Sequence, residues 1–308
     1  MDLRQLGALV AVADHGSFSA AARSLHTVQS NVSTHVARLE RELGATLVDR
    51  ATGTLTAEGE IVVNRSRRIQ AELQALAADV ASARADVSGT VRIGVIGTTA
   101  RWLVPRLIEE VGSDHPKVRV VVVDATTTSL VPQLVNGQLD LAVLNLPVDD
   151  PDIEIEPLFD EDRVLVAPAG HPYHEAERLT VNDLGSHPLL LEPQGTSFRD
   201  QLDEQVRLAG TRLIPQAEVD GMRLLASLAF QGFGAALLPA SAAPSWVGGD
   251  WKRIPVDGLE GRSVGLGSRR RGVLSAPARV TVAVLRRVVE VDGEAHGGIR
   301  PAPHDAPG

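Results

Sequence analysis

The sequence predicts an α/β protein in three parts: a small helical segment, a long connecting helix and a larger module of strands and helices. Three observations support this prediction. The first 60 residues contain three short helical patterns, and residues 60–87 contain no Gly or Pro and repeat apolar residues in steps of three and four. From Ser88 onwards, strand patterns alternate with helical ones. Such alternation implies crossover connections and a mostly parallel sheet.

Composition excludes several classes of protein. The 308 residues are 44% hydrophobic, carry a net charge of −9 and include no cysteine. Disulfides, thiolate metal sites and a cysteine nucleophile are therefore excluded. We expect a cytoplasmic protein with no membrane partner, because the N-terminus lacks the apolar run of a signal peptide and no segment offers the roughly 20 apolar residues that span a bilayer.

The first segment has the pattern of a helix-turn-helix. Residues 3–13 show helical spacing, Gly16 is suited to end that helix, and the serines that follow it are suited to cap a second. A third helix is expected from about residue 28 to Leu43, with an apolar stripe on one face. Two short helices joined by a tight break, the second polar at its start, are typical of this motif.

These residues resemble the LysR-type transcriptional regulators. The matching motifs follow in order over about 45 residues: Ser17-Phe18-Ser19-Ala20-Ala21-Ala22, Leu25-His26, Gln29-Ser30-Asn31-Val32-Ser33, Leu39-Glu40-Arg41-Glu42-Leu43-Gly44 and Leu55-Thr56-x-x-Gly59. The resemblance implies a winged helix-turn-helix over residues 1–59 that binds double-stranded DNA. It also implies that the third helix enters the major groove with its N-terminal part.

The candidate DNA contacts are short polar side chains at the start of the third helix and basic groups near them. Gln and Asn pair with adenine edges, and Ser and Thr bond phosphates beside a helix N-terminus. The set comprises Thr27, Gln29, Ser30, Asn31, Ser33, Thr34, His35, Arg38 and, in the wing, Arg50. The alternative interpretation is a well-capped, solvated helix start.

Charge gives this segment little support. Residues 1–60 hold five Arg, no Lys and seven acids, a net charge of −2, so the electrostatic footprint of a DNA-binding protein is weak. The wing is also shorter than is usual in the family. Only residues 51–54 separate Arg50 from Leu55, and they include no basic residue.

Residues 60–88 are expected to form a coiled-coil linker helix. Its a/d seam comprises Val62, Ser66, Ile69, Leu73, Leu76, Val80, Ala83 and Val87. The seam favours a homodimer through residues 60–87, as the resemblance also implies, and the family usually forms homotetramers. The alternative is an amphipathic helix that packs only on its own domain.

Residues 89–291 resemble the effector-binding domain of the same family, a two-lobed α/β fold similar to periplasmic binding proteins. The matching motifs are Leu103-Val104-Pro105, His115-Pro116, Gly137-x-Leu139-Asp140-Leu141-Ala142, His171-Pro172 and Gly232-Phe233-Gly234-Ala235-Ala236-Leu237-Leu238-Pro239. We expect lobe I at about 89–162 and 263–291, and lobe II at about 163–262. Residues 292–308, rich in Gly, Pro and His, are expected to be a disordered tail.

The periodicity places the elements of this module only approximately. Strands are expected near residues 90–95, 118–123, 139–144, 164–167, 189–191, 216–219, 235–238 and 263–267. Helices are expected near residues 102–111, 130–135, 198–209, 222–230 and 279–291.

An effector site is expected between the lobes, where strands end and helices begin. Hydroxyl side chains and free N–H groups there favour a small organic anion, and an Arg would pair with its carboxylate. The candidates are Thr98, Thr99, Arg101, Thr127, Thr128, Asn145, Thr196, Ser197 and Met222. The alternative is that the hydroxyls only cap helices.

Together these features predict a sequence-specific transcriptional regulator controlled by a small-molecule effector, with RNA polymerase as a further partner to consider. The two alternative functions are an enzyme and a solute-binding protein. The sequence contains no HExxH, GxSxG, Walker or GxGxxG motif, so we expect no enzyme and assign no catalytic residue, metal ligand or cofactor. A solute-binding protein would fit the two-lobed module alone, but not the helix-turn-helix.

Overall fold

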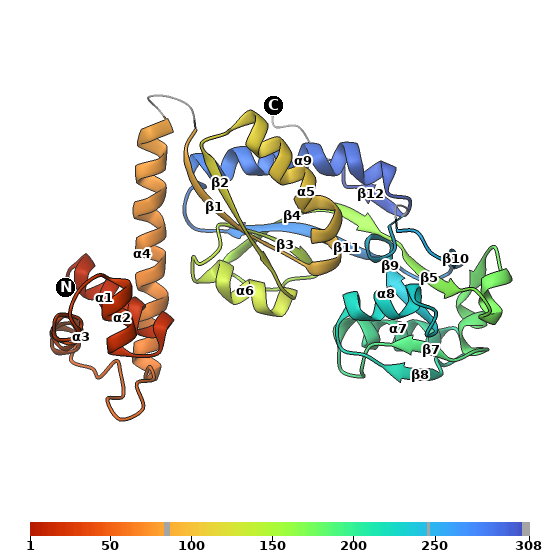
Figure 1. Cartoon of the computed structure of the whole chain (residues 1–308), viewed down its shortest axis with the longest axis horizontal. Helices are drawn as coiled ribbons and strands as arrows, with labels where there is room; N and C mark the ends of the chain where they lie inside the picture. Colours follow the sequence, from red (N-terminus) through yellow and green to blue (C-terminus); the bar gives the residue numbers. More distant parts are fainter. Residues whose placement is uncertain (83–86, 245–246, 304–308) are drawn as a thin grey trace.

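The computed structural model describes residues 1–82, 87–244 and 247–303. A small helical head lies at one end of the long helix α4 (Ala57–Ser82), and two sheet-containing lobes follow beside its other end (Figure 1). Lobe I lies next to α4, and lobe II lies beyond lobe I on the side away from the head. The head and the lobes are therefore joined along the chain by one helix.

The head consists of α1 (Leu3–His15), α2 (Phe18–Ser24) and α3 (Gln29–Leu43), packed against the first turns of α4. Each helix has a recognisable start or stop. Asp2 and Gln5 form a capping box on α1, and Ser17 caps α2. Gly16 and Gly44 end α1 and α3 in the left-handed conformation that glycine adopts without strain. The small wing after α3 is closed by an isolated bridge between Val48 and Leu55.

Lobe I is a six-stranded sheet in the order β12-β4-β11-β3-β1-β2. Its strands are β1 (Gly89–Val95), β2 (Val118–Asp124), β3 (Leu141–Asn145), β4 (Ile153–Glu161), β11 (Arg262–Arg269) and β12 (Ile299–Pro301). Helices α5 (Gly97–Asp114) and α9 (Ala276–Ala295) cover one face, and α6 (Thr127–Val135) covers the other (Figure 1). The core between them is almost entirely aliphatic.

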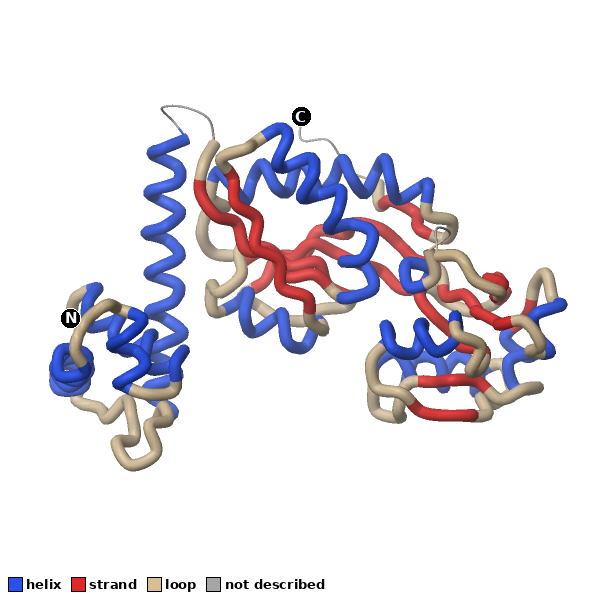
Figure 2. Tube along the Cα trace, in the orientation of Figure 1, coloured by secondary structure: helices blue, strands red, loops and turns tan. Residues whose placement is uncertain are grey.

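Lobe II is a second six-stranded sheet in the order β6-β10-β5-β9-β7-β8. Its strands are β5 (Arg163–Pro168), β6 (Leu179–Thr180), β7 (Leu189–Leu191), β8 (Pro215–Glu218), β9 (Ala235–Pro239) and β10 (Trp251–Asp257). Helices α7 (Ser197–Leu208) and α8 (Met222–Phe230) and the short turns η1 (Pro172–Glu175), η2 (Val181–Gly185) and η3 (Ala240–Ala242) complete it. Figure 2 shows the two groups of strands as separate sheets.

The chain crosses between the lobes twice. The first crossing joins β4 to β5 through Asp162, and the second joins β10 to β11 through residues 258–261. Both crossings lie close together in lobe I, because β4 and β11 pair with each other. They form the hinge between the lobes.

Each sheet is mixed, not mostly parallel as the alternation of strands and helices implied. In lobe I, β1 pairs in parallel with β2 and β3, but β11, β4 and β12 add antiparallel partners. In lobe II, β7 is parallel to its neighbours while β5 is antiparallel to both of its own. Two of the antiparallel strands, β5 and β11, enter by the hinge crossings, which bypass the right-handed crossover of a βαβ unit.

The prediction of a disordered tail from Asp292 is wrong for residues 292–303. Helix α9 continues to Ala295, and β12 then pairs with β4. Ile299 is buried against the lobe I core, and the Ala302 N–H donates to the Leu158 carbonyl at 2.8 Å. The strand satisfies backbone groups that β4 would otherwise expose at the sheet edge. Residues 304–308 lie outside the described part of the chain.

The linker helix also differs from its prediction at both ends. It begins at Ala57 and is described to Ser82, and Val87 is not helical but packs against the lobe I core. Ala83 lies outside the described residues. Within the described ranges, no helix is long and apolar enough to cross a membrane.

Candidate functional site

Helix α3 lies at the edge of the head farthest from the lobes (Figure 1), and its first turn is an exposed polar surface. Gln29, Ser30, Asn31 and Thr34 are exposed, while Val32, Val36 and Leu39 turn into the head core. Arg38 is exposed one turn further along. The helix therefore divides into a buried apolar face and a free polar one, as a groove-reading helix needs.

Local hydrogen bonds leave the first turn of α3 open. The N-cap is Val28, and no side chain among the described residues caps the helix start, so the interpretation of a well-capped helix is not supported. Asn31 donates to the Thr27 hydroxyl at 2.9 Å, and the Thr34 hydroxyl donates to the Ser30 carbonyl at 2.8 Å. Backbone N–H groups of the first turn remain available to a phosphate.

Arg50 is exposed but is held against the surface of the head by local contacts. Its guanidinium forms an ion pair with Glu40 at 2.8 Å, donates to the Ser33 hydroxyl at 3.2 Å, and lies 4.8 Å from the centroid of the Phe18 ring. Burial opposes ionisation of Glu40, but hydrogen bonds from Leu47 N–H and Arg50 outweigh it and hold the pKa of Glu40 below its ordinary value. Arg50 thus anchors the wing, an interaction with Glu40 that the sequence analysis missed.

His35 differs from the other candidate DNA contacts because it is partly buried. Its Nδ1 has no hydrogen-bond partner among the residues that the structure describes. A partly buried ring has little freedom to reach a DNA backbone, so His35 is the weakest member of the set.

Helix α4 has two different faces. Ala71, Ala75 and Ala78 face lobe I, where the Ala78 Cβ lies 3.2 Å from the Cβ position of Gly89. Apolar side chains lie on the opposite side of the helix and are 40–61% exposed: Ile69, Leu73, Leu76 and Val80. The predicted seam is therefore divided, because Val62 and Ser66 pack on the head while these four remain uncovered.

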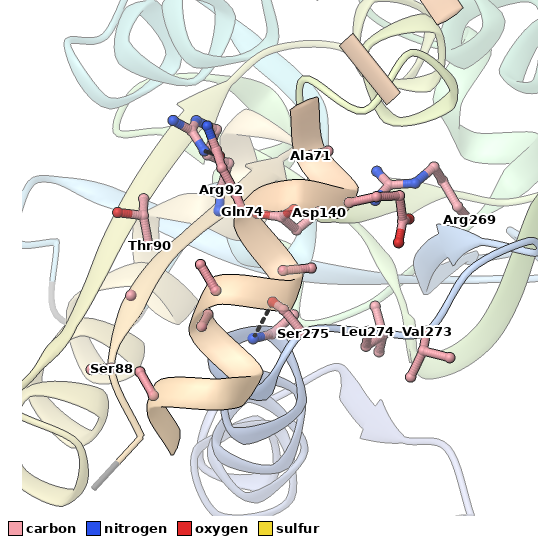
Figure 3. Close-up of a pocket in the computed structure, with 17 residues that line it drawn as sticks. Ala71, Gln74, Ser88, Thr90, Arg92, Asp140, Arg269, Val273, Leu274 and Ser275 are labelled. Carbon is pink, nitrogen blue, oxygen red and sulfur yellow. Dashed lines mark hydrogen bonds between the residues drawn. The ribbon is translucent and has the colours of Figure 1, made fainter. Parts of the chain in front are cut away.

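Polar contacts fix the alanine face of α4 to lobe I. Arg68 donates to the Val135 carbonyl at 2.7 Å and contacts Asp152 at 3.3 Å. At the other end, Asp79 accepts from the Ala276 N–H at 2.7 Å. Between these contacts lies a cavity of about 440 Å³, lined on the α4 side by alanines and on the lobe I side by residues such as Arg92, Asp140 and Arg269 (Figure 3).

The predicted effector residues of lobe I converge at one sheet edge. Thr98 and Thr99 follow β1, Thr127 and Thr128 follow β2, and Asn145 ends β3. Because these strands are parallel neighbours, their carboxyl ends meet. Thr127 accepts from the Asn145 N–H at 3.0 Å, which joins two of the three loops directly.

Two of these side chains have buried polar atoms with unused hydrogen-bonding capacity. Thr99 is fully buried, and its hydroxyl has no partner among the described residues. The same holds for Oδ1 of Asn145. A buried polar atom without a partner costs free energy, and such atoms are expected where a ligand or water completes the site. By contrast, Arg101 and Thr128 are exposed.

The predicted residues of lobe II are placed at helix starts. Thr196 caps α7 and also donates to Glu192, which follows β7, while Ser197 is exposed beside it. Burial raises the pKa of Glu192. Met222 begins α8 and packs on the lobe II core. Its neighbour Arg223 forms an ion pair with Asp124 at the end of β2, which ties the two lobes together.

A cluster of buried charges at the hinge is not among the residues predicted from the sequence. Glu161 ends β4, Arg163 begins β5 and Arg262 begins β11. Arg262 pairs with Glu161 at 2.7 Å and donates to the Thr98 hydroxyl at 2.7 Å. Glu161 also accepts from the Ser241 N–H in lobe II. The only sequence signal is that Arg163 directly precedes an apolar strand. No metal-binding group of His, Cys, Asp or Glu occurs in the described ranges.

A helix-turn-helix head, a linker helix with a free apolar stripe and a hinged two-lobed module define an effector-controlled DNA-binding transcriptional regulator. Two family models match this chain: the bacterial regulatory helix-turn-helix protein of the lysR family over residues 3–60, and the LysR substrate binding domain over residues 84–290. The chain belongs to the LysR family of transcriptional regulators and is not an enzyme.

Individual relatives agree with this assignment. A probable hydrogen peroxide-inducible genes activator of Mycobacterium leprae is 33% identical over 300 residues, covering 93% of this chain and 94% of its own. A full-length OxyR from Pseudomonas aeruginosa with a cysteine-to-aspartate substitution is 26% identical with a TM-score of 0.77, covering 100% and 99%. Full-length CbnR in complex with its target DNA is 25% identical with a TM-score of 0.68, covering 93% and 99%.

Proposed function

We propose that this regulator binds its operator as a homodimer and responds to a small organic anion held non-covalently between its two lobes. In this proposal residues 1–59 read DNA, residues 60–88 dimerise, and residues 89–291 bind the effector, with β12 completing lobe I. DNA is read by the polar side chains at the start of α3. The effector contacts are Thr98, Thr99, Thr127 and Asn145 from lobe I, with Thr196, Ser197 and Met222 from lobe II.

One observation carries the effector site. Five predicted residues meet at the carboxyl ends of β1, β2 and β3, and two of them, Thr99 and Asn145, bury polar atoms that lack partners within the described residues. A ligand oxygen and a ligand donor would satisfy these two atoms. Arg101 is exposed and no longer favoured as the carboxylate partner.

The names of the relatives raise peroxide as an alternative signal. A reversible response to peroxide through thiol oxidation needs a cysteine, and this chain has none. The complete absence of cysteine therefore favours a bound effector over a disulfide or sulfenic acid switch.

The uncovered stripe of α4 supports the dimer, because four large apolar side chains in a line would otherwise face water. A homotetramer needs a further surface, and Ile108 on α5 and Phe233 after α8 are exposed apolar candidates for it. RNA polymerase remains a candidate partner. Since the proposed partner is chromosomal DNA, we place the protein in the cytoplasm.

Gel retardation with the DNA upstream of the gene that encodes this protein tests operator binding. A thermal-shift screen with small organic acids then tests the effector, because a ligand raises the unfolding midpoint of the state that it binds. If the protein retards the DNA but no organic acid raises its unfolding midpoint, the protein is a regulator whose effector is not a small organic acid.

The variant Thr99→Val tests the site itself. Valine keeps the shape but removes the hydroxyl, so a buried ligand oxygen loses its partner at a cost of about 1–3 kcal/mol. We expect operator binding without effector to persist and the response to need a higher effector concentration. Exposed Thr128, changed to Val in the same way, is the matched control. Equal effector affinity of wild type and Thr99→Val in calorimetry would move the site elsewhere.

A further inference from the structure

Arg163 lies at the hinge between the lobes, at the first residue after the first crossing. It begins β5, two residues after Glu161, and its side chain is only 2% exposed. The guanidinium lies 4.9 Å from the centroid of the Phe198 ring in the first turn of α7. It therefore reaches the same end of lobe II as Thr196 and Ser197, the predicted effector residues.

The hydrogen bonds of Arg163 are incomplete. One terminal nitrogen donates to the Gln201 side chain. Its Nε and Nη1 have no partner among the described residues, and no carboxylate described here forms an ion pair with it. Three of the five N–H groups of a guanidinium are thus left without an acceptor.

The neighbouring charges do not compensate Arg163. Glu161, the nearest buried carboxylate on the hinge, is already paired with Arg262 and accepts from the Ser241 N–H. Burial, with a further contribution from Arg262, outweighs the opposing effect of Glu260 and Glu161 and lowers the pKa of Arg163 to about 10. At neutral pH the side chain is still a cation. The Arg262–Glu161 ion pair is neutral as a whole, so the charge of Arg163 remains as one unbalanced positive charge buried at the hinge.

Lobe II also contains a buried arginine that is fully paired. Arg199, 3% exposed on α7, contacts Asp203 at 2.9 Å and Glu218 at 3.0 Å and donates to the Glu192 carbonyl at 2.8 Å. That is the arrangement expected of an arginine that stabilises the fold. Arg163 shares its burial but lacks its acceptors, which indicates that its acceptor comes from outside the chain.

We propose that Arg163 is the carboxylate-binding residue of the interlobe site, with its unpaired Nε and Nη1 groups donating to the effector's anionic group. This inference rests on the proposed effector function and names the group that recognises the anion. The other buried cation of the hinge already has its carboxylate, so a single negative charge is needed. The effector class that fits is a monocarboxylate whose body extends toward Thr99 and Asn145.

The proposal has a consequence for stability that a structural arginine does not share. An unpaired buried charge destabilises the unliganded protein, whereas breaking a complete ion pair removes stabilising contacts. Arg163→Met should therefore raise the unfolding midpoint of the unliganded chain by about 2–4 °C. Arg199→Met, the matched control in the same lobe, should lower it.

The experiment uses the full-length protein and sodium formate, the smallest carboxylate, with sodium chloride at equal ionic strength as reference. Wild-type protein should gain stability from formate beyond chloride, and Arg163→Met should lose that gain. Operator binding is measured separately on wild-type protein, so a failure of the regulator assignment would be distinguished from a failure of this one. If Arg163→Met is destabilised like Arg199→Met, or if wild type responds to formate no more than Arg163→Met, the proposal is overturned.

Discussion

At the scale of single residues, the start of α3 separates side chains that are occupied from side chains that are free. Asn31, Thr34 and Ser33 each have a partner inside the head. Gln29, the first residue of the helix, is exposed. A free amide next to an uncapped helix start is well placed to read a base edge, so Gln29 is the strongest candidate for specific contact.

We therefore expect Gln29→Ala to weaken operator binding by about 1–3 kcal/mol while leaving the fold intact. Arg41→Ala, an exposed change near the other end of α3, is the control and should have a smaller effect. Affinity is measured by fluorescence anisotropy on operator and on scrambled DNA. Unchanged specific affinity of both Gln29→Ala and Ser33→Ala would show that α3 does not read the site.

Glu192 predicts a dependence of stability on pH. Burial raises the pKa of this carboxyl in the folded protein, so the folded state holds the proton more tightly than the unfolded chain. Stability is then lost as the pH rises from the ordinary glutamate value through the higher folded value. Glu192→Gln removes the titration, and its amide oxygen can still accept from Thr196.

We expect Glu192→Gln to be more stable than wild type at neutral pH, and the difference to disappear in acid, where the carboxyl is protonated in both states. Urea unfolding across the pH range measures it. Glu175→Gln, an exposed change in lobe II, should show no such trend. A constant difference between Glu192→Gln and wild type at all pH values would refute the pH dependence.

Whether a site residue can be predicted from the sequence depends on the pattern of the residues around it. Thr99 and Asn145 were predicted because strand ends and helix starts are visible as changes of period. Glu161, Arg163 and Arg262 were missed, since an Arg or Glu beside a strand is ordinarily solvated. Their burial results from two hinge crossings meeting, a contact between positions about 100 residues apart.

At the scale of elements, α4 carries two kinds of surface on opposite sides. Small alanines allow a close approach to lobe I, and large aliphatic side chains remain for a second helix. Docking on lobe I and dimerisation therefore do not compete. The apolar seam of α4 could be predicted from the sequence but the alanine face could not, because alanine is also a common residue on solvated helix faces.

The two faces should respond differently to substitution. Leu73→Glu places a charge in the apolar stripe and should lower the mass measured by light scattering, together with operator affinity. Wild-type mass for both Leu73→Glu and Leu76→Glu would place the dimer interface elsewhere.

Ala78→Leu collides with Gly89 and should detach α4 from lobe I, extending the particle in small-angle scattering without changing its mass. Ala77→Leu, an adjacent exposed position, is the control.

Four strands were not predicted, β4, β6, β10 and β12, and two of them share a feature that argues against a strand. β4 contains Pro157 and β10 contains Pro255, and proline within an apolar run argues against a strand. In the structure Pro157 lies opposite Gly265, where the β4–β11 register shifts, and Pro255 lies at the end of the β10–β5 ladder. Both prolines occupy places where a missing N–H costs little.

At the scale of the whole molecule, the head and the module were predicted well because each is a set of local patterns in a fixed order. The two lobes came from the family resemblance, since periodicity alone cannot assign strands to separate sheets. The mixed sheets follow from the chain returning to lobe I through β11, α9 and β12. Pairing between strands that are far apart in the sequence produces no local sequence pattern from which it could be predicted.

The alanine face of α4 also decides where this protein can be cut and rejoined. Hybrid regulators are made by exchanging DNA-reading heads, and a junction placed after α4 would bring a foreign helix with larger side chains against Gly89. From Arg68 onwards α4 belongs to the sensing half, through Arg68, Asp79 and its alanines, whereas Val62 and Val63 belong to the head. A junction within α4 between Val63 and Arg68 keeps both sets of contacts, so a transplanted head would inherit this chain's signal.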